Sequence, residues 1–239
     1  MITAKVLMAG FASSLVFAFS ATAANSGRAG VGTVEFTEGD VLLNGKALAS
    51  NPNAFPVMAQ NDSLQTGKGH AEVLLTPGVF LRLGGQASAR LIDGSLTNTR
   101  VRLEQGPAML EVDELHKENA IRIEVGPDTV QILKTGLYRF DANAGYVQVL
   151  DGSVGVEGGR KYIKAGKRQQ VSLNADAGRT RFSENKDELD RWSRLRSEYE
   201  AEANIASAQY VYDMGWGWGF SNWVWNPWFG AYTWLPGSA

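Results

Sequence analysis

The 239-residue chain contains no cysteine. This absence excludes a disulfide framework, a zinc–thiolate site and a thiol nucleophile. Histidine is nearly absent as well, since the chain has only His70 and His116, and neither lies in a ligand-spaced pattern. We expect both on the surface, His70 at a hairpin tip and His116 in a loop. A transition-metal site would need carboxylates about which the sequence is silent, so we predict no metal and no cofactor.

Signatures of catalysis are also missing. The sequence has no G-x-S-x-G, P-loop or H-E-x-x-H motif. A glycosidase needs two carboxyl groups about 5 to 10 Å apart across a cleft, and proximity in sequence does not establish such a pair. Two acidic groups near expected strand ends are the weak candidates: Glu35, Glu38 and Asp40, and Glu111, Asp113 and Glu114. We therefore predict that the protein is not an enzyme and has no catalytic residues, with a carbohydrate-active enzyme as a minor alternative.

The chain has no surplus of basic charge. It carries 23 Lys and Arg against 25 Asp and Glu, a net charge of −2 at pH 7. Proteins that bind nucleic acid normally present a basic surface to the phosphates. We therefore expect no nucleic-acid partner.

The first 23 residues predict export. One Lys is followed by an apolar run and then by Ala21-Thr22-Ala23, which fits the A-x-A pattern of a secretory cleavage site. We expect cleavage after Ala23 and a periplasmic or secreted protein. The stretch from Val6 to Ala24 is nearly long enough to span a membrane, so an uncleaved inner-membrane anchor is the alternative.

After a short linker at 24–29, residues 30–182 have the pattern of a β domain. Short apolar runs alternate with turn residues such as Asn44-Gly45 and Thr76-Pro77-Gly78. We expect about 12 to 15 short strands. The fold class is mainly β, with a β roll, a sandwich and a short β-solenoid all open at this point.

Residues 183–214 predict one long amphipathic helix. Asn185 and Glu188 have the spacing of a capping box. A stripe at steps of three and four follows, formed by Leu189, Trp192, Leu195, Tyr199, Ala203, Ala206 and Tyr210. The acid–base pairs Asp187–Arg191, Asp190–Arg194 and Arg196–Glu200 would add support at i, i+4. We expect the stripe to pack on the β domain. An oligomer formed through the helix stays open but is not favoured.

Residues 215–239 form a tail that holds six of the seven Trp and no charged residue. Its Asn, Pro and Gly residues argue against a transmembrane helix. We expect an irregular tail, and three roles are open: docking on its own domain, contact with a partner or envelope surface, and stacking on a glycan. The candidate partner-binding residues are Trp216, Trp218, Trp223, Trp225, Trp228, Phe229 and Trp234.

Longer motifs in the β region resemble a known family. They read "GTVEFTEGDVLLNGKAL", "NDSLQTGKGHAEVLLTPGVFLRL", "NAIRIEVGPDTVQILKTGLYRFDA" and "VQVLDGSVGV". Together these stretches resemble the FecR domain, named for the periplasmic part of a regulator of iron-siderophore uptake. Gly136 with Tyr138, and Gly152 with Val154, look like core landmarks of that family. The resemblance implies a β fold and a non-catalytic module for binding or sensing in the cell envelope.

The chain also departs from the founding regulator, which begins with a cytoplasmic anti-sigma segment. We expect no such segment here, because the signal sequence begins at residue 1. The helix and the Trp-rich tail are foreign to that regulator too. The predicted function is thus an exported envelope module that binds protein, glycan or membrane-surface partners. The alternative is a periplasmic sensor or regulator in FecR-type signalling without its own anti-sigma segment.

Overall fold

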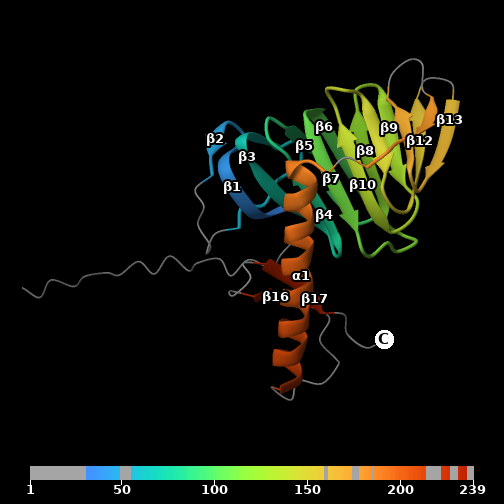
Figure 1. The fold of residues 1–239 in the computed structure, drawn as a ribbon. Helices are drawn as coiled ribbons and strands as arrows, with labels where there is room; N and C mark the ends of the chain where they lie inside the picture. The colour runs from blue at the N-terminus through green and yellow to red at the C-terminus, as the bar shows by residue number, and fades with distance from the viewer. Residues whose placement is uncertain are drawn as a thin grey trace, which may run out of the picture.

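The computed structural model describes residues 31–48, 55–158, 161–173, 178–184, 186–213, 222–226 and 231–235. These residues are mainly in β-strands, and one long helix lies in the chain between the main group of strands and two final short strands (Figure 1). The prediction of a mainly β fold with one C-terminal helix is therefore confirmed.

Fifteen strands form a single sheet. They are β1 (Thr33–Leu43), β2 (Lys46–Ala47), β3 (Ser63–Thr76), β4 (Val79–Leu83), β5 (Ser88–Ser95), β6 (Asn98–Gln105), β7 (Pro107–Val112), β8 (Ala120–Val125), β9 (Asp128–Ile132), β10 (Gly136–Asp141), β11 (Tyr146–Val149), β12 (Ser153–Gly158), β13 (Lys161–Gly166), β14 (Gln169–Ser172) and β15 (Arg179–Arg181).

The sheet rolls up on itself. Its order is β13-β12-β9-β8-β6-β5-β3-β4-β7-β10-β11-β14-β15, and β1 pairs with both β2 and β3. Strands β6 and β8 pair in parallel, whereas the other described pairs are antiparallel. Strand β13 comes close to β14, so the curved sheet nearly closes. Of the three predicted arrangements, this one corresponds to a roll.

Turn chemistry fixes the first hairpins where the sequence predicts them. Asn44 and Gly45 have φ angles of 52° and 75° between β1 and β2, which is the left-handed pair that a tight hairpin turn requires. Gly78 has a φ of 67° between β3 and β4. Both predicted turns are confirmed.

The core lies inside the roll. Strand β8 alternates half-buried and buried residues along its six positions, the period of two that places every second side chain inward. Fully buried side chains from several strands meet there, among them Leu64, Leu110, Tyr138, Phe140 and Val147. Burial of each large apolar side chain contributes about 1.5–3 kcal/mol, so this core accounts for most of the sheet's stability.

The single helix, α1, spans Glu188–Asp213. Its N-cap is Asp187, whereas Asn185 of the predicted capping box lies outside the described residues. The backbone N–H of Asp190 donates to Oδ1 of Asp187 at 3.0 Å, and the N–H of Asp187 donates to Oδ2 of Asp190 at 3.2 Å. Two aspartates thus form the reciprocal capping arrangement, two residues later than the sequence motif predicts.

The helix packs on the sheet through a more polar face than we expected. Leu195 and Tyr199 of the predicted stripe are 44% and 41% exposed. The buried face is Leu189, Trp192, Ser193, Arg196, Glu200, Ala203 and Ser207. The reason is that the sheet carries buried charged residues at this place, and polar helix residues bind them. Of the three predicted i, i+4 pairs, Arg196–Glu200 forms at 3.0 Å, whereas Asp187 and Asp190 bind Arg139 of β10.

Part of the tail is regular. Strands β16 (Asn222–Asn226) and β17 (Ala231–Leu235) form an antiparallel hairpin beside α1. The prediction of an irregular tail is wrong for these two segments, because alternating aromatic and β-branched residues favour extended backbone. Figure 1 shows that α1 extends past the sheet and that the hairpin lies along this projecting part. Among the described helical residues, none form a segment long and apolar enough to cross a membrane.

Candidate functional site at the helix–sheet junction

The junction between α1 and the sheet is built on a buried carboxylate. Glu72 of β3 and Arg82 of β4 lie opposite each other in the register of the two strands, and both are fully buried. Arg82 Nε donates to Oε2 of Glu72 at 2.5 Å. Arg196 of α1 donates to Oε1 of the same carboxylate through Nη2 at 2.6 Å. Each oxygen of Glu72 is thus bound by a guanidinium, one from the sheet and one from the helix.

The network continues on both sides of Glu72. Arg82 Nη1 donates to Glu111 of β7 and to the hydroxyl oxygens of Ser193 and Ser197, the latter two at 3.0 and 3.1 Å. The Ser197 hydroxyl in turn donates to Glu111 at 2.6 Å. Three strands and two turns of helix therefore share one hydrogen-bonded cluster, which fixes the axial position of α1 on the sheet.

Acidic groups outnumber basic ones at this point. Carboxylate oxygens of Glu35, Glu72 and Glu200 lie within 4.8 Å of one another, and all three residues are buried. Burial opposes ionisation of Glu72, but Arg82 and Arg196 outweigh it and hold its pKa below the usual range. Burial raises the pKa of Glu200 to about 8, and the charge of Glu72 adds to that effect. Glu200 is therefore neutral at pH 7.

A metal ion does not fit this acidic cluster. Both oxygens of Glu72 already accept from guanidinium groups, and Arg196 also donates to Oε1 of Glu200 at 3.0 Å. A cation among these carboxylates would lie close to the positive charge of Arg196, which repels it. A proton on Glu200 removes one negative charge from the cluster without that repulsion.

A second ionic clamp holds the start of the helix. Arg139 of β10 is buried and donates to Asp187 at 2.5 Å and to Asp190 at 2.6 Å. Burial opposes ionisation of Asp187, but its hydrogen bonds with Arg139 and Asp190 hold its pKa well below the usual range. The two capping residues therefore also anchor the helix to the sheet.

His70 is not on the surface, as the sequence predicted, but inside this junction. It lies within β3, is 9% exposed and stacks on Trp192 of α1 with ring centres 4.7 Å apart. The prediction failed because β3 runs unbroken through Gly67 and Gly69, with a register shift against β1 where a tip was expected. The Trp192 indole N–H donates to Glu38 at 3.0 Å. His116 is exposed, as predicted, and its Nε2 lies 2.9 Å from Oε1 of Glu114.

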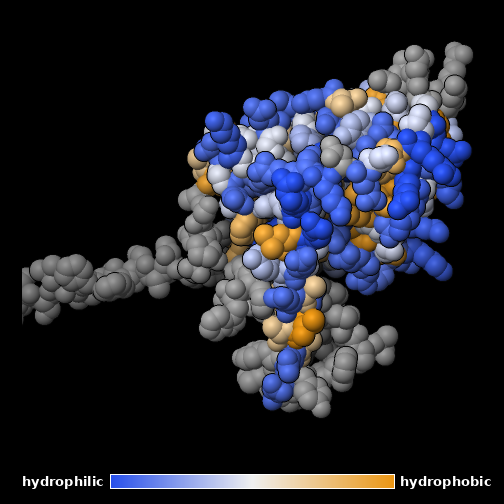
Figure 2. Space-filling view, viewed as in Figure 1, coloured by the Kyte–Doolittle hydropathy of each residue, from blue (hydrophilic) through white to orange (hydrophobic). Residues whose placement is uncertain are grey.

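A cavity of about 350 Å³ lies beside the junction, between α1 and strands β7, β10 and β11. Its apolar lining comes from Met109, Leu137, Leu150 and Phe182. Figure 2 shows hydrophobic surface next to α1 over these strands. The charged side chains that line it are three basic and three acidic: Arg139, Lys186 and Arg194, and Glu111, Glu184 and Asp190. With no surplus of either sign, the cavity does not favour a charged ligand.

The hairpin brings together some of the predicted partner-binding residues. Trp223 pairs with Trp234, and Trp225 pairs with Tyr232. Directly opposed residues, and residues two apart in a strand, share a face of a two-stranded sheet. The register therefore places these four aromatic residues on one face of the hairpin. Trp216, Trp218, Trp228 and Phe229 lie outside the described residues.

Comparisons with known proteins find a family match within the β region. Residues 62–155 match the family model described as FecR protein, so this part of the chain is a FecR-like domain, as the motifs predicted. Two crystal structures of a proposed anti-sigma factor from Parabacteroides distasonis ATCC 8503, at 2.50 and 1.65 Å resolution, are similar in fold, each with 17% identity and a TM-score of 0.45. The first similarity covers 58% of this chain and 72% of that one, and the second 55% and 64%. No curated protein matches the chain.

Proposed function

We propose that the chain is a non-catalytic, exported binding module of the bacterial cell envelope, built from a FecR-like domain and an appendage that binds its partner. The appendage is the projecting part of α1 with the β16–β17 hairpin beside it (Figure 1). The observation that carries the proposal is the buried clamp of Glu72, Arg82 and Arg196. Because that clamp fixes α1 to the sheet, the hairpin keeps a set position beside the sheet, where β17 also lies close to β1.

The aromatic face of the hairpin supplies the binding surface. Each Trp or Tyr can bury about 150–250 Å² in a contact. Four of them on one face exceed the contiguous apolar patch of a few hundred Å² that is usual on a monomer. An uncharged aromatic surface suits an envelope protein, the C–H faces of a polysaccharide or the headgroup region of a membrane. Trp216, Trp218, Trp228 and Phe229 are the further candidates for contact with the partner.

Removal of residues 216–239 tests the proposal. The truncated protein keeps the sheet and all of α1, so it should melt within a few degrees of the full chain. At about 0.5 M salt, which screens charge-driven contacts with lipid, it should no longer sediment with envelope fractions from the native bacterium. A truncated protein that still sediments with them would overturn the proposal. A melting temperature many degrees lower would do the same, because burying three Trp is worth roughly 5 kcal/mol and the tail would then be core.

The FecR match favours a second candidate function, a periplasmic sensor or regulator that passes a signal to a separate anti-sigma protein. Deleting the gene would then change transcription of a small, defined set of genes. Loss of a module that only binds the envelope would not have this effect. Restoring the protein without residues 216–239 separates the two functions, since the sensor would restore transcription through its FecR-like domain alone.

A further inference from the structure

One end of the chain's β region is strongly basic. Residues 161–181 contain six Lys and Arg and one acidic residue, in a chain whose net charge is −2. These residues form β13, the turn that follows it, β14 and the edge strand β15. The rest of the sheet therefore carries an acidic surplus, and this edge stands apart from it.

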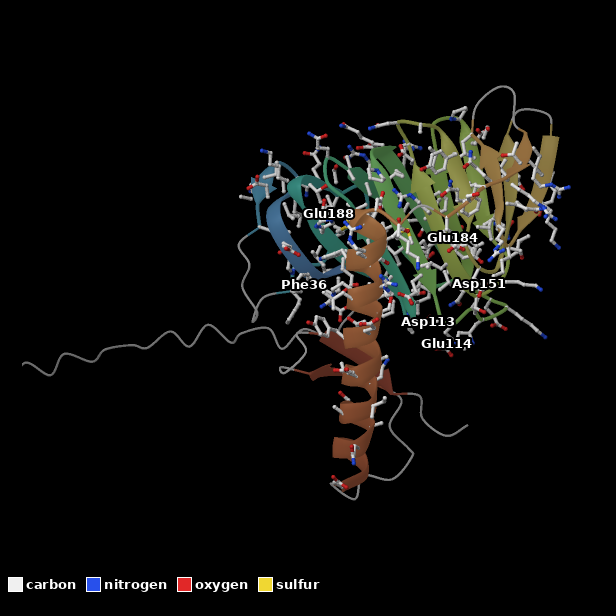
Figure 3. The ribbon with its side chains drawn as sticks, viewed as in Figure 1. Phe36, Asp113, Glu114, Asp151, Glu184 and Glu188 are labelled. Atoms are coloured by element: carbon white, nitrogen blue, oxygen red, sulfur yellow. The ribbon has the colours of Figure 1, made fainter. Side chains whose placement is uncertain are left out.

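The structure gathers these cations into a continuous strip. Arg181 lies opposite Gln169 in the register of β14 and β15, next to the turn that holds Lys167 and Arg168. At the other end of β15, Arg179 donates to the backbone oxygen of Lys164 at 3.0 Å. The five basic residues named here, Lys164, Lys167, Arg168, Arg179 and Arg181, are all exposed. Figure 3 shows nitrogen-tipped side chains gathered at the end of the sheet where β12 and β13 lie.

Little acidic charge neutralises the strip. Lys167 pairs with Asp151 at 3.0 Å, but both side chains are more than 60% exposed, and such pairs are weak in water. Within the described parts of the chain, no ion pair involves Lys164, Arg168, Arg179 or Arg181. Four cations are therefore available to an external anion.

The backbone at Arg168 supports a role beyond folding. Its φ angle is 62°, in the left-handed region that Gly or Asn adopts far more readily than Arg. A strained residue of this kind, held at a turn, often serves a function. Arg168 is exposed in the turn between β13 and β14, so it belongs to the strip.

We propose that the β13–β15 edge binds a membrane surface rich in anionic phospholipid headgroups. Tyr162 decides between a lipid surface and a soluble polyanion. It is 57% exposed on β13, and the two-residue period of a strand places it on the same face as the exposed Lys164. An exposed aromatic residue with a polar end, next to cations, is typical of protein surfaces at the headgroup level. A linear polyanion binds through its charges, so it would not need the aromatic ring of Tyr162.

Sedimentation with vesicles tests the proposal on the full-length protein. The probes are vesicles of phosphatidylcholine alone, and of phosphatidylcholine and phosphatidylglycerol at a ratio of about seven to three. Each basic residue near such a surface adds roughly fivefold to affinity at physiological salt. The variant with Lys164→Gln, Arg168→Gln, Arg179→Gln and Arg181→Gln should bind the anionic vesicles roughly a hundredfold more weakly or worse. Raising the salt to about 0.5 M should weaken the native protein similarly.

A matched control carries the same charge change on exposed residues elsewhere: Lys46→Gln, Lys117→Gln, Lys186→Gln and Arg194→Gln. It should bind anionic vesicles with an affinity within a few-fold of that of the native protein, and both variants should melt at the native temperature.

Equal losses of affinity in the two variants, or binding that does not depend on phosphatidylglycerol, would overturn the proposal. So would tight binding of dextran sulfate without vesicle binding, which would mean a soluble polyanion. The hairpin surface is uncharged, so binding through it would not follow lipid charge, and either proposal can fail alone.

Discussion

Arg196 of α1 and Glu72 of β3 are joined by a hydrogen-bonded ion pair of 2.6 Å, although they lie 124 positions apart in the chain and are both buried. This pair is the main link between the helix and the FecR-like sheet. Removing one partner leaves the other buried charge with only part of its compensation, which costs far more than the loss of an exposed pair.

Arg196→Ala and Glu72→Ala should therefore each lower the free energy of unfolding by about 3–5 kcal/mol, as measured by urea denaturation. Arg194→Ala, an exposed position on the same helix, is the control and should change it by about 0.5 kcal/mol or less. Equal effects at positions 194 and 196 would show that the pair does not hold the helix.

Glu200 makes the junction sensitive to alkaline pH. Its pKa is raised by burial to about 8 from 4.5. Between these values the folded state holds a proton that the unfolded state has released, so this contribution to stability falls as pH rises through the window. Urea denaturation at pH 6 and pH 9 should show the native protein less stable at pH 9. Glu200→Gln should remove most of that difference. Glu198→Gln, at an exposed position, should leave it unchanged.

Asp187 combines a helix cap with an ion pair, and two substitutions separate these roles. Asp187→Ala removes both and should destabilise the protein by more than the roughly 1 kcal/mol of a cap alone. Asp187→Asn keeps a capping oxygen but loses the charge opposite Arg139, so it should cost less at pH 7. The low pKa of Asp187 adds stability that is lost as pH falls below about 4. The gap between the native protein and the Asn variant should therefore narrow as pH falls from 7 towards 2, and a constant gap would contradict the pairing.

Gly152 is required by the packing of Tyr138. A Cβ atom at Gly152 would lie 2.2 Å from the Tyr138 hydroxyl, and its φ angle is 92°. That hydroxyl donates to the backbone oxygen of Lys134 and accepts from the N–H of Ser153. Gly152→Ala should therefore lower the melting temperature by many degrees. Gly85→Ala, where the nearest atom to a new Cβ lies at 3.6 Å, should change it little.

The sheet could be predicted from sequence because its signals are local. The alternation in β8 and the Asn44-Gly45 turn depend on neighbouring residues alone, and both are confirmed. The junction could not be predicted in the same way, because it depends on residues far apart in the chain. Glu72 and Arg82 each interrupt an apolar strand, which was a usable signal. Nothing local indicated that Arg196 of a later helix would join them.

The helix shows that a pattern of apolar residues can be an incomplete guide to which residues are buried. Leu195 and Tyr199 fit the predicted stripe and yet are exposed, whereas Ser193 and Glu200 are buried. A polar side chain is buried at low cost only where it finds a partner, and Arg82 and Arg196 supply those partners here. The stripe correctly included Leu189, Trp192 and Ala203, which are buried. Only the structure places the polar partners beside the helix, so the spacing alone could not exclude Leu195 and Tyr199.

The aromatic face of the hairpin allows the most direct test of the proposed function. Trp223, Trp225, Tyr232 and Trp234 share one face by register, and Val224 and Thr233 pair on the other. At about 0.5 M salt, which screens charge-driven binding through the β13–β15 edge, replacing the four aromatic residues with Ser should abolish sedimentation of the full-length protein with native envelope fractions. Val224→Ser with Thr233→Ser should leave it intact. Undiminished sedimentation of the four-residue variant, or equal loss in both variants, would contradict a partner surface on this face of the hairpin.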